Sequence, residues 1–206
     1  EVVDEDGEVQ RRTRFVYDGD DLLHEIVEGQ DDTGSFRTVR TYVIGDVTHA
    51  PWASREVVQR GDVVETSPWT HYVNDAVGAP DQLISSKGQV LSQVEMTLWG
   101  KAPENAPTPL RFPGMVADPD TGLLYNRHRY LDPGTGRYIS PDPLGFEGGF
   151  DSYRYADNAP NRYIDPDGLY AETVITDVDG NRYVGRSGSY GPREDLHPAV
   201  AAPRAR

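Results

Sequence analysis

The chain has 206 residues, of which 36% are hydrophobic, and it carries a formal net charge of −14 at pH 7. This acidity argues against a nucleic-acid-binding surface across the main body, and the absence of cysteine excludes disulfide bonds and thiolate zinc sites. No stretch approaches the roughly 20 apolar residues of a membrane-spanning helix, and no basic-then-apolar signal peptide opens the chain.

Short runs of β-branched and aromatic residues alternate with Gly-containing turns over the first hundred residues, which is typical of β-hairpins. Helical periodicity is nearly absent, and only the tract 50–59 is compatible with a helical turn or two. The polar residues 1–12 suggest a frayed edge. The expected strands span residues 14–17, 22–27, 36–44, 56–58, 63–66, 70–73, 82–85 and 90–98.

The second half of the chain changes character twice. Residues 101–110 are rich in Pro and predict a loop, whereas 111–169 are dense in turn signals and tyrosines and contain two Asp-Pro-x-Gly boxes. Residues 170–206 differ again and begin with a predicted hairpin over 172–184. We therefore expect four parts with the boundaries 1–100, 101–110, 111–169 and 170–206, and an abrupt boundary between a scaffold and its cargo after residue 169.

Six motifs in order resemble the C-terminal part of the rearrangement-hotspot (Rhs), or YD-repeat, family, including its repeat-associated core domain. A single box is weak support, but the ordered set covers most of residues 10–169. The motifs are FVYDGDDLL at 15–23, THYVNDAVGAP at 70–80, RFPG at 111–114, TGLLYNRHRY at 121–130, SPDPLG at 140–145 and DPDGL at 165–169.

The resemblance implies an all-β fold in which YD-repeat hairpins form part of a spiral shell, or cocoon. The core-associated domain, 111–169, closes the shell as an autoprotease plug, and a short C-terminal extension follows it. Such shells enclose a C-terminal toxin used in competition between bacteria. In many relatives the plug is an aspartic autoprotease that cuts after the Leu of the last box, which here is the bond between Leu169 and Tyr170.

The resemblance also implies binding partners and a route of export from the cell. The partners are the rest of the shell and the chain's own toxin, with an immunity protein and a secretion-system spike as further candidates. We expect synthesis in the cytoplasm and export by a dedicated apparatus. Because the chain opens without Met and in mid-repeat, we also expect it to be a fragment of a longer polypeptide.

An aspartic protease needs two carboxyl groups close enough that like-charge repulsion keeps one protonated. The charged member activates water, and the neutral member donates a proton to the scissile carbonyl. Asp142 and Asp165 open the two Asp-Pro-x-Gly boxes, and the resemblance favours them as this pair. Asp167, two residues before Leu169, is the alternative second member.

A structural role competes with catalysis, because Asp before Pro is an ordinary turn opener whose side chain accepts backbone hydrogen bonds. We assign Asp132, which also precedes a Pro, to a turn. Relatives often carry an Arg immediately before the first catalytic Asp, where this chain has Pro141. We expect Arg127, Arg129 and Arg137 to pair with acidic residues or to cap carbonyls, and the tyrosines of 111–169 to pack.

No metal site or cofactor is expected, since the five His residues show no metal-ligand spacing. Two other functions remain open. One is a shell segment that carries cargo without cutting. The other is a small nuclease-like effector in 170–206, where Tyr-Val-Gly-Arg at 183–186 faintly resembles the second strand of GIY-YIG nucleases. The first-strand motif of those nucleases is missing, and the charge of this tail is roughly balanced.

Overall fold

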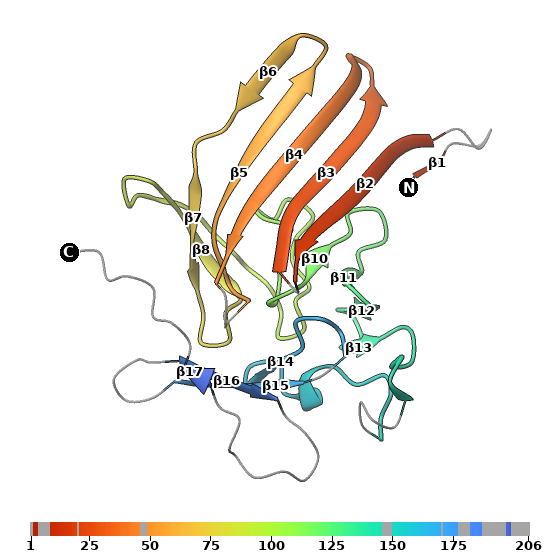
Figure 1. Ribbon diagram of the computed structural model, residues 1–206, viewed down its shortest axis with the longest axis vertical. Coiled ribbons are helices and arrows are strands. Elements are labelled where there is room, and N and C mark those ends of the chain that lie inside the picture. Colours follow the sequence, from red (N-terminus) through yellow and green to blue (C-terminus); the bar gives the residue numbers. More distant parts are fainter. Residues whose placement is uncertain are drawn as a thin grey trace.

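The structure, a computed structural model, describes residues 2–3, 9–19, 21–45, 49–145, 150–169, 171–176, 182–186 and 197–198. These residues form antiparallel strands in three sheets and contain no α-helix. The expectation of an all-β chain is confirmed. A 3₁₀ turn, η2, spans Ala156–Asn158. Figure 1 shows one sheet of long strands above two small sheets.

The long sheet is built from consecutive hairpins. Its strand order is β1-β2-β3-β4-β5-β7-β8-β9, and β6 pairs with β5. The turn after Asp18 contains Gly19, whose φ of +59° is a conformation that glycine adopts without steric cost. The strands are β1 (Val2–Val3), β2 (Val9–Asp18), β3 (Asp21–Asp31), β4 (Gly34–Ile44), β5 (Pro51–Arg60), β6 (Val63–Thr66), β7 (Thr70–Asn74), β8 (Pro80–Ser85) and β9 (Val90–Gln93).

Three local expectations in this sheet were wrong. Residues 51–60 form the strand β5, which contains the expected strand 56–58 and leaves no helical turn in 50–59, because pairing places Val57 opposite Val39 and Glu56 opposite Arg40. Polar residues 9–12 belong to β2 and pair with β3 and β1 instead of fraying. The strand β9 ends at Gln93, before a turn in which the Gly100 amide donates to the Thr97 carbonyl. Pairing with neighbouring strands decided the first two outcomes.

Two small sheets follow. The first has the order β10-β11-β12-β13, and the second has the order β14-β15-β16-β17. In the second sheet, β14 precedes the predicted boundary after residue 169, and β15 follows it. Their bounds are β10 (Val116–Ala117), β11 (Leu124–Asn126), β12 (Arg129–Asp132), β13 (Arg137–Tyr138), β14 (Tyr163–Ile164), β15 (Glu172–Thr176), β16 (Arg182–Arg186) and β17 (His197–Pro198).

The largest apolar core combines both halves of the chain. Val77 and Ala79, from the turn between β7 and β8, are buried with residues that come after position 110. Trp99 packs beside this core and against Gly136, where a Cβ would meet the indole ring. The buried members are Val77, Ala79, Phe112, Met115, Leu124, Leu131, Tyr138, Tyr155, Ala156 and Ile164. Packing therefore joins the expected shell segment to the expected plug.

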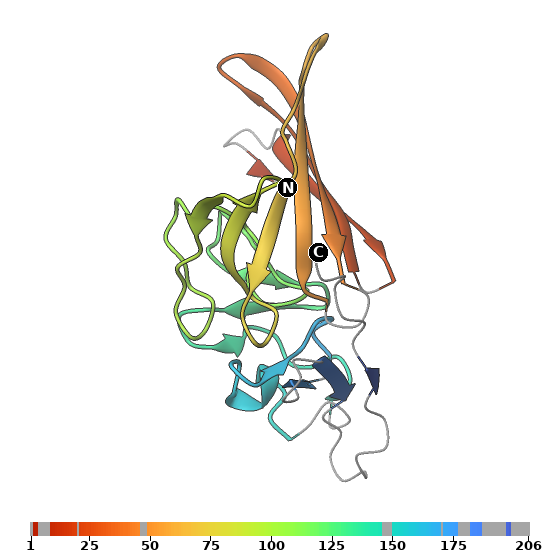
Figure 2. The same ribbon diagram turned by 90° about the vertical axis from the view of Figure 1, so that its left-hand side faces the viewer.

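A second core attaches the long sheet to the first of the small sheets. Leu22 and Tyr42 of the long sheet are buried against Leu110 and Val116. At the same interface Phe15 stacks on Tyr125, with ring centroids 4.9 Å apart. Figure 2 shows β10 to β13 on one side of the long sheet. The residues of the expected plug are thus held against the foot of the hairpins.

Candidate functional site

A buried arginine lies between the carboxylates of Asp142 and Asp165. Arg129 Nη1 is 3.1 Å from Asp142 Oδ2, and Arg129 Nη2 is 3.0 Å from Asp165 Oδ2. All three side chains are at most 3% exposed. A planar guanidinium presents donors in a fixed fork, so one arginine can bind both groups at once. The fold therefore brings together the two residues that open the Asp-Pro-x-Gly boxes.

Three segments of the chain form this cluster: the strand β12, the box that begins at Asp142 and the box that begins at Asp165. Arg129 comes from β12, and its Nη1 also donates to the Ser152 carbonyl at 3.2 Å. The Asp142 amide donates to the same carbonyl at 2.8 Å, which fixes the first box beside the arginine. The described part of the connection from Asp142 to Asp165 is mostly turn and 3₁₀ structure.

Two further polar side chains hold Asp165. The Tyr138 hydroxyl donates to Asp165 Oδ2 at 2.8 Å. Asn126 Nδ2 lies 2.7 Å from the Tyr138 hydroxyl and 2.8 Å from the Asp165 carbonyl oxygen, donating to both. The Arg129 guanidinium also lies 3.7 Å from the centre of the Tyr138 ring. These contacts fix the orientation of the carboxyl group.

Burial raises the pKa of Asp165 to about 7, although Arg129 and the Tyr138 hydroxyl stabilise its ionised form. The charge of Asp167 adds to the rise. Burial likewise raises the pKa of Tyr138 and Tyr155 well above the usual value, so both phenols are neutral. Asp165 is thus a carboxyl group that gains and loses its proton near neutral pH, as a general acid requires.

The last box, 165–169, folds back on its own first residue. The Leu169 amide donates to Asp165 Oδ1 at 2.9 Å and to Asp167 Oδ1 at 3.0 Å. Asp167 thus contacts Leu169, and no ion pair joins it to Arg129 within the described part of the chain. Tyr170, on the far side of the predicted cut, lies outside the described residues.

Two glycine contacts lock this box in place. A Cβ on Gly114 would lie 2.6 Å from the Pro166 carbonyl carbon, and one on Gly168 would lie 2.5 Å from the Asn126 carbonyl oxygen. Both glycines have positive φ values, +79° and +77°. Only glycine permits such close approach of two backbones at these angles. The motif RFPG therefore supports the box that contains the predicted cleavage site.

Each carboxylate also makes a turn-type contact. Asp142 Oδ1 accepts the Leu144 amide at 2.8 Å, just as Asp165 Oδ1 accepts the Leu169 amide. The turn-forming interpretation of these residues therefore has a geometric basis beside the catalytic one. Asp132 makes a similar turn contact with the Gly134 amide at 2.8 Å, but this contact is exposed.

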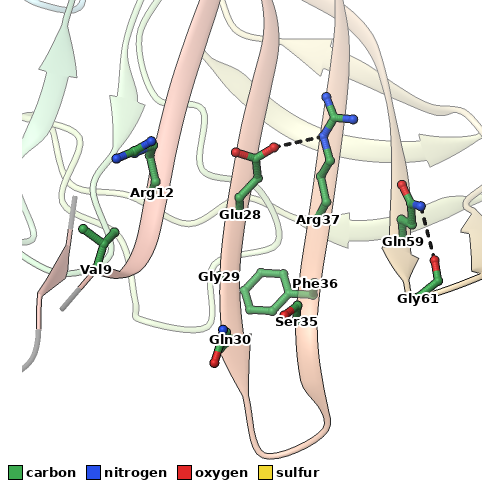
Figure 3. Close-up of a pocket in the computed structure, with 10 residues that line it drawn as sticks. All are labelled: Val9, Arg12, Glu28, Gly29, Gln30, Ser35, Phe36, Arg37, Gln59 and Gly61. Atoms are coloured by element: carbon green, nitrogen blue, oxygen red, sulfur yellow. Dashed lines mark hydrogen bonds and ion pairs between the residues drawn. The ribbon is translucent and has the colours of Figure 1, made fainter.

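Other parts of the described structure offer less chemistry. An open depression of about 580 Å³ lies near the tips of the long hairpins, at the end of the sheet remote from β13 and β14 (Figures 1 and 3). Its charged side chains include Glu28 and Arg37, which pair with each other at 3.3 Å. Among the residues that the structure describes, no group of three or more acidic or His side chains is arranged to hold a metal ion, and no helix could cross a membrane.

Known proteins resemble this chain in sequence, although no protein-family model matches it. It is 35% identical over 157 residues to double-stranded DNA deaminase toxin A of Burkholderia cenocepacia, and 34% identical over 151 residues to the probable deoxyribonuclease RhsB of Dickeya dadantii. Each alignment covers 68% of this chain and 10% of the relative. The toxin protein Tse5 of Pseudomonas aeruginosa is 45% identical over 82 residues, which are 38% of this chain and 6% of Tse5.

The chain belongs to the Rhs family. It spans about a tenth of the length of the two relatives that it matches over 68% of its own length.

The fold of this Rhs chain resembles a solved structure. The crystal structure of TcdB2-TccC3 without its hypervariable C-terminal region matches 82% of the chain with a TM-score of 0.54 and 23% identity, over 10% of that structure's chain. At this identity the similarity concerns the fold.

The sequence of the Rhs chain did not predict which arginine and which tyrosine bind the two carboxyl groups. The expectation that Arg129 pairs with acidic residues is confirmed, but the same expectation was held for Arg127 and Arg137. Tyr138 was assigned to packing alone, yet its hydroxyl binds Asp165. The alternation of β12, with Arg129 and Leu131 buried, is the one local signal that points Arg129 inward.

Replacing Arg129 with Lys should destabilise this Rhs chain by about 2 kcal/mol, because an ammonium cannot reproduce both charge-assisted contacts of the guanidinium fork. Urea unfolding monitored by tryptophan fluorescence measures the change, since Trp99 packs beside the same core. Arg137 is the matched control: its side chain is 45% exposed and pairs with Asp151. Arg137→Lys should change stability by less than about 0.5 kcal/mol. Equal costs at the two positions would contradict the bidentate role of Arg129.

Proposed function

We propose that the chain is the C-terminal part of an Rhs toxin shell that cuts its own backbone between Leu169 and Tyr170. The observation that carries the proposal is the contact between Asp165 Oδ1 and the Leu169 amide, in a carboxyl group that shares Arg129 with Asp142. The scissile carbonyl is separated from that amide nitrogen only by the Leu169 Cα. The substrate bond therefore belongs to the same folded box as one of the two carboxyl groups.

The proposed reaction is an aspartic hydrolysis. Asp142 takes a proton from a water molecule while the water oxygen attacks the Leu169 carbonyl carbon. Protonated Asp165 donates its proton to the carbonyl oxygen. The resulting diol loses a proton to Asp165 while Asp142 protonates the leaving nitrogen and the C–N bond breaks. One water is consumed, a carboxyl group forms on Leu169, an amino group forms on Tyr170, and both aspartates return to their starting states.

Burial supports the assignment of Asp165 as the acid. A carboxyl group with a pKa near 7 is substantially protonated at neutral pH, whereas an ordinary aspartic acid is not. Arg129 supports the pair by limiting repulsion whenever both carboxylates are charged. Asp167 is the alternative partner, but its contact is with the Leu169 amide and not with the shared arginine.

The roles that we propose for the other parts of the chain are those of the corresponding parts of Rhs proteins. Residues 1–100 form part of the shell wall, 101–110 a connecting loop and 111–169 the plug, and 170–206 begin the enclosed effector. The names of the relatives, a DNA deaminase toxin and a probable deoxyribonuclease, suggest effectors that act on DNA. The partners are the remaining shell and the effector, with an immunity protein and a secretion spike as further candidates, and the route is export by a dedicated apparatus into target cells.

One alternative has an observation in its favour. Both Asp142 and Asp165 accept backbone amides within their own boxes, as turn-forming residues do. In that case the chain is a carrier segment that encloses cargo without cutting. The nuclease-like tail has no comparable support, because the side chains from 172 onward, including the Tyr-Val-Gly-Arg run, lie outside what the structure describes.

Intact-mass measurement on the full-length parent protein tests the proposal. We expect two fragments, the first ending at Leu169 and the second beginning at Tyr170, with the new N-terminus identified by sequencing. Incubation between about pH 5 and pH 7 should bring the reaction to completion, because the pKa of Asp165 is about 7. A parent protein that stays in one piece throughout this range would leave the carrier interpretation in place.

A further inference from the structure

The last box, 165–169, contains two acidic residues, Asp165 and Asp167. In this box the structure leaves one carboxylate without a role in the proposed reaction. Asp167 is half-buried and accepts the Leu169 amide at 3.0 Å through Oδ1. The same amide donates to Asp165 Oδ1 at 2.9 Å. Two carboxylate groups therefore meet at a single hydrogen, beside the bond that is proposed to break.

We propose that Asp167 is a positioning residue whose negative charge keeps Asp165 protonated and able to act as the acid in the self-cleavage. This inference rests on the proposed function and adds to it the group that sets its pH range. Asp167 does not touch the reacting carbonyl in the proposal. It acts through Asp165 and through the Leu169 amide that both residues hold.

The electrostatic balance of the site explains why such a group is needed. Arg129 contacts Asp165 directly and favours its ionised form, which cannot donate a proton. Burial favours the protonated form of Asp165 and so opposes the effect of Arg129. The negative charge of Asp167, which accepts the same Leu169 amide, acts in the same direction as burial. Without the charge of Asp167, the effect of Arg129 on the pKa of Asp165 is less offset, and Asp165 loses its proton at lower pH.

Among the described residues, the other groups named around Asp165 do not replace this charge. Tyr138 of β13 contacts it as a neutral donor, and Tyr155, which precedes η2, is a neutral phenol buried in the same core. Asp142 is acidic but is itself bound to Arg129. Asp75, in the turn after β7, is engaged by the amides of Val77 and Ala79. Asp167 is the acid that shares a hydrogen-bond donor with Asp165.

The competing interpretation is that Asp167 only shapes a turn, and two substitutions separate the roles. Asp167→Asn keeps an oxygen acceptor for the Leu169 amide and removes the charge. Asp167→Glu keeps the charge and displaces the acceptor. A charge-setting role predicts that the pH dependence follows the charge, whereas a turn role predicts that only the rate changes and that it follows the acceptor.

The experiment uses the full-length parent protein, synthesised in a cell-free reaction near pH 8.5, where Asp165 is mostly ionised and cutting is slow. Aliquots are then shifted to a series of lower pH values, and the cut fraction is measured over time. In the wild type, cleavage should decline as pH rises through about 7, the pKa of Asp165. In Asp167→Asn this decline should move down by about one pH unit, so that cutting at pH 7.5 is about tenfold slower.

Asp167→Glu should keep the decline where the wild type has it, even if its overall rate is lower. Asp132→Asn, which removes an acid that opens an exposed turn, is the matched control and should leave the profile unchanged. An unshifted profile in Asp167→Asn, or a shift in Asp167→Glu equal to that in Asp167→Asn, overturns this inference while cleavage itself stands. A wild type that is uncut at every pH overturns the proposed function, and the inference with it.

Discussion

Asp165→Asn is expected to slow cleavage after Leu169 by on the order of 10²–10⁴-fold, since it removes the general acid. Asn is close to Asp in shape and retains a side-chain oxygen that can accept the Leu169 amide. The fold should tolerate the change well, because the raised pKa shows that burial favours an uncharged group at this position. The Asp142→Asn variant should lose cleavage to a similar extent, through loss of the base. Time-resolved intact mass of the parent protein gives both rates.

Asp132→Asn provides the matched control for both variants. Asp132 also precedes a Pro and also opens a turn, with Oδ1 accepting the Gly134 amide at 2.8 Å. It contacts neither Arg129 nor Leu169 in any described hydrogen bond or ion pair. Its replacement should leave cleavage at the wild-type rate. If Asp165→Asn and Asp142→Asn also cut normally, both carboxylates serve only their turns, and the cleavage depends on other groups.

Gly114→Ala is expected to destabilise the plug by about 4 kcal/mol, through overpacking added to the cost of a left-handed backbone conformation. Gly114 has φ +79°, and a Cβ there would lie 2.6 Å from the Pro166 carbonyl carbon and 2.8 Å from its Cα. The obstacle is backbone, so it cannot move aside as a flexible side chain can. Displacement of Pro166 would also displace Asp165, so cleavage should fail with folding. Urea unfolding and the cut fraction measure the two effects.

Gly122 offers a matched control for the backbone conformation. Its φ is +72°, close to that of Gly114, but nothing lies within 4 Å of where its Cβ would be. Gly122→Ala should therefore cost only about 1–2 kcal/mol, the price of the left-handed conformation alone. Cleavage should continue in this variant. Equal costs for the two substitutions would show that contact with Pro166 does not support the box 165–169.

Local patterns predicted the strands and turns of the long sheet well, with limits that have a physical origin. Alternation and Gly-containing turns located β2, β3, β4, β6, β7 and β8. The tract 50–59 was misassigned because its mixture of Ala, Glu and Val has little preference of its own. Pairing with β4 on one side and with β6 and β7 on the other made it a strand. A β propensity depends on neighbours that a single sequence does not display.

The sequence by itself determined the all-β class and the Rhs membership, and its two Asp-Pro-x-Gly boxes singled out Asp142 and Asp165 as candidates, because turn chemistry and ordered motifs are local properties. Only the tertiary structure decided which cation lies between those carboxylates. Arg129 and Asp165 are 36 residues apart, and Arg127 and Arg137, which have the same side chain, lie on either side of Arg129 in the sequence, so sequence position does not select among the three. Burial selected Arg129, because β12 points it into the core, where an unpaired charge is costly and two carboxylates meet it.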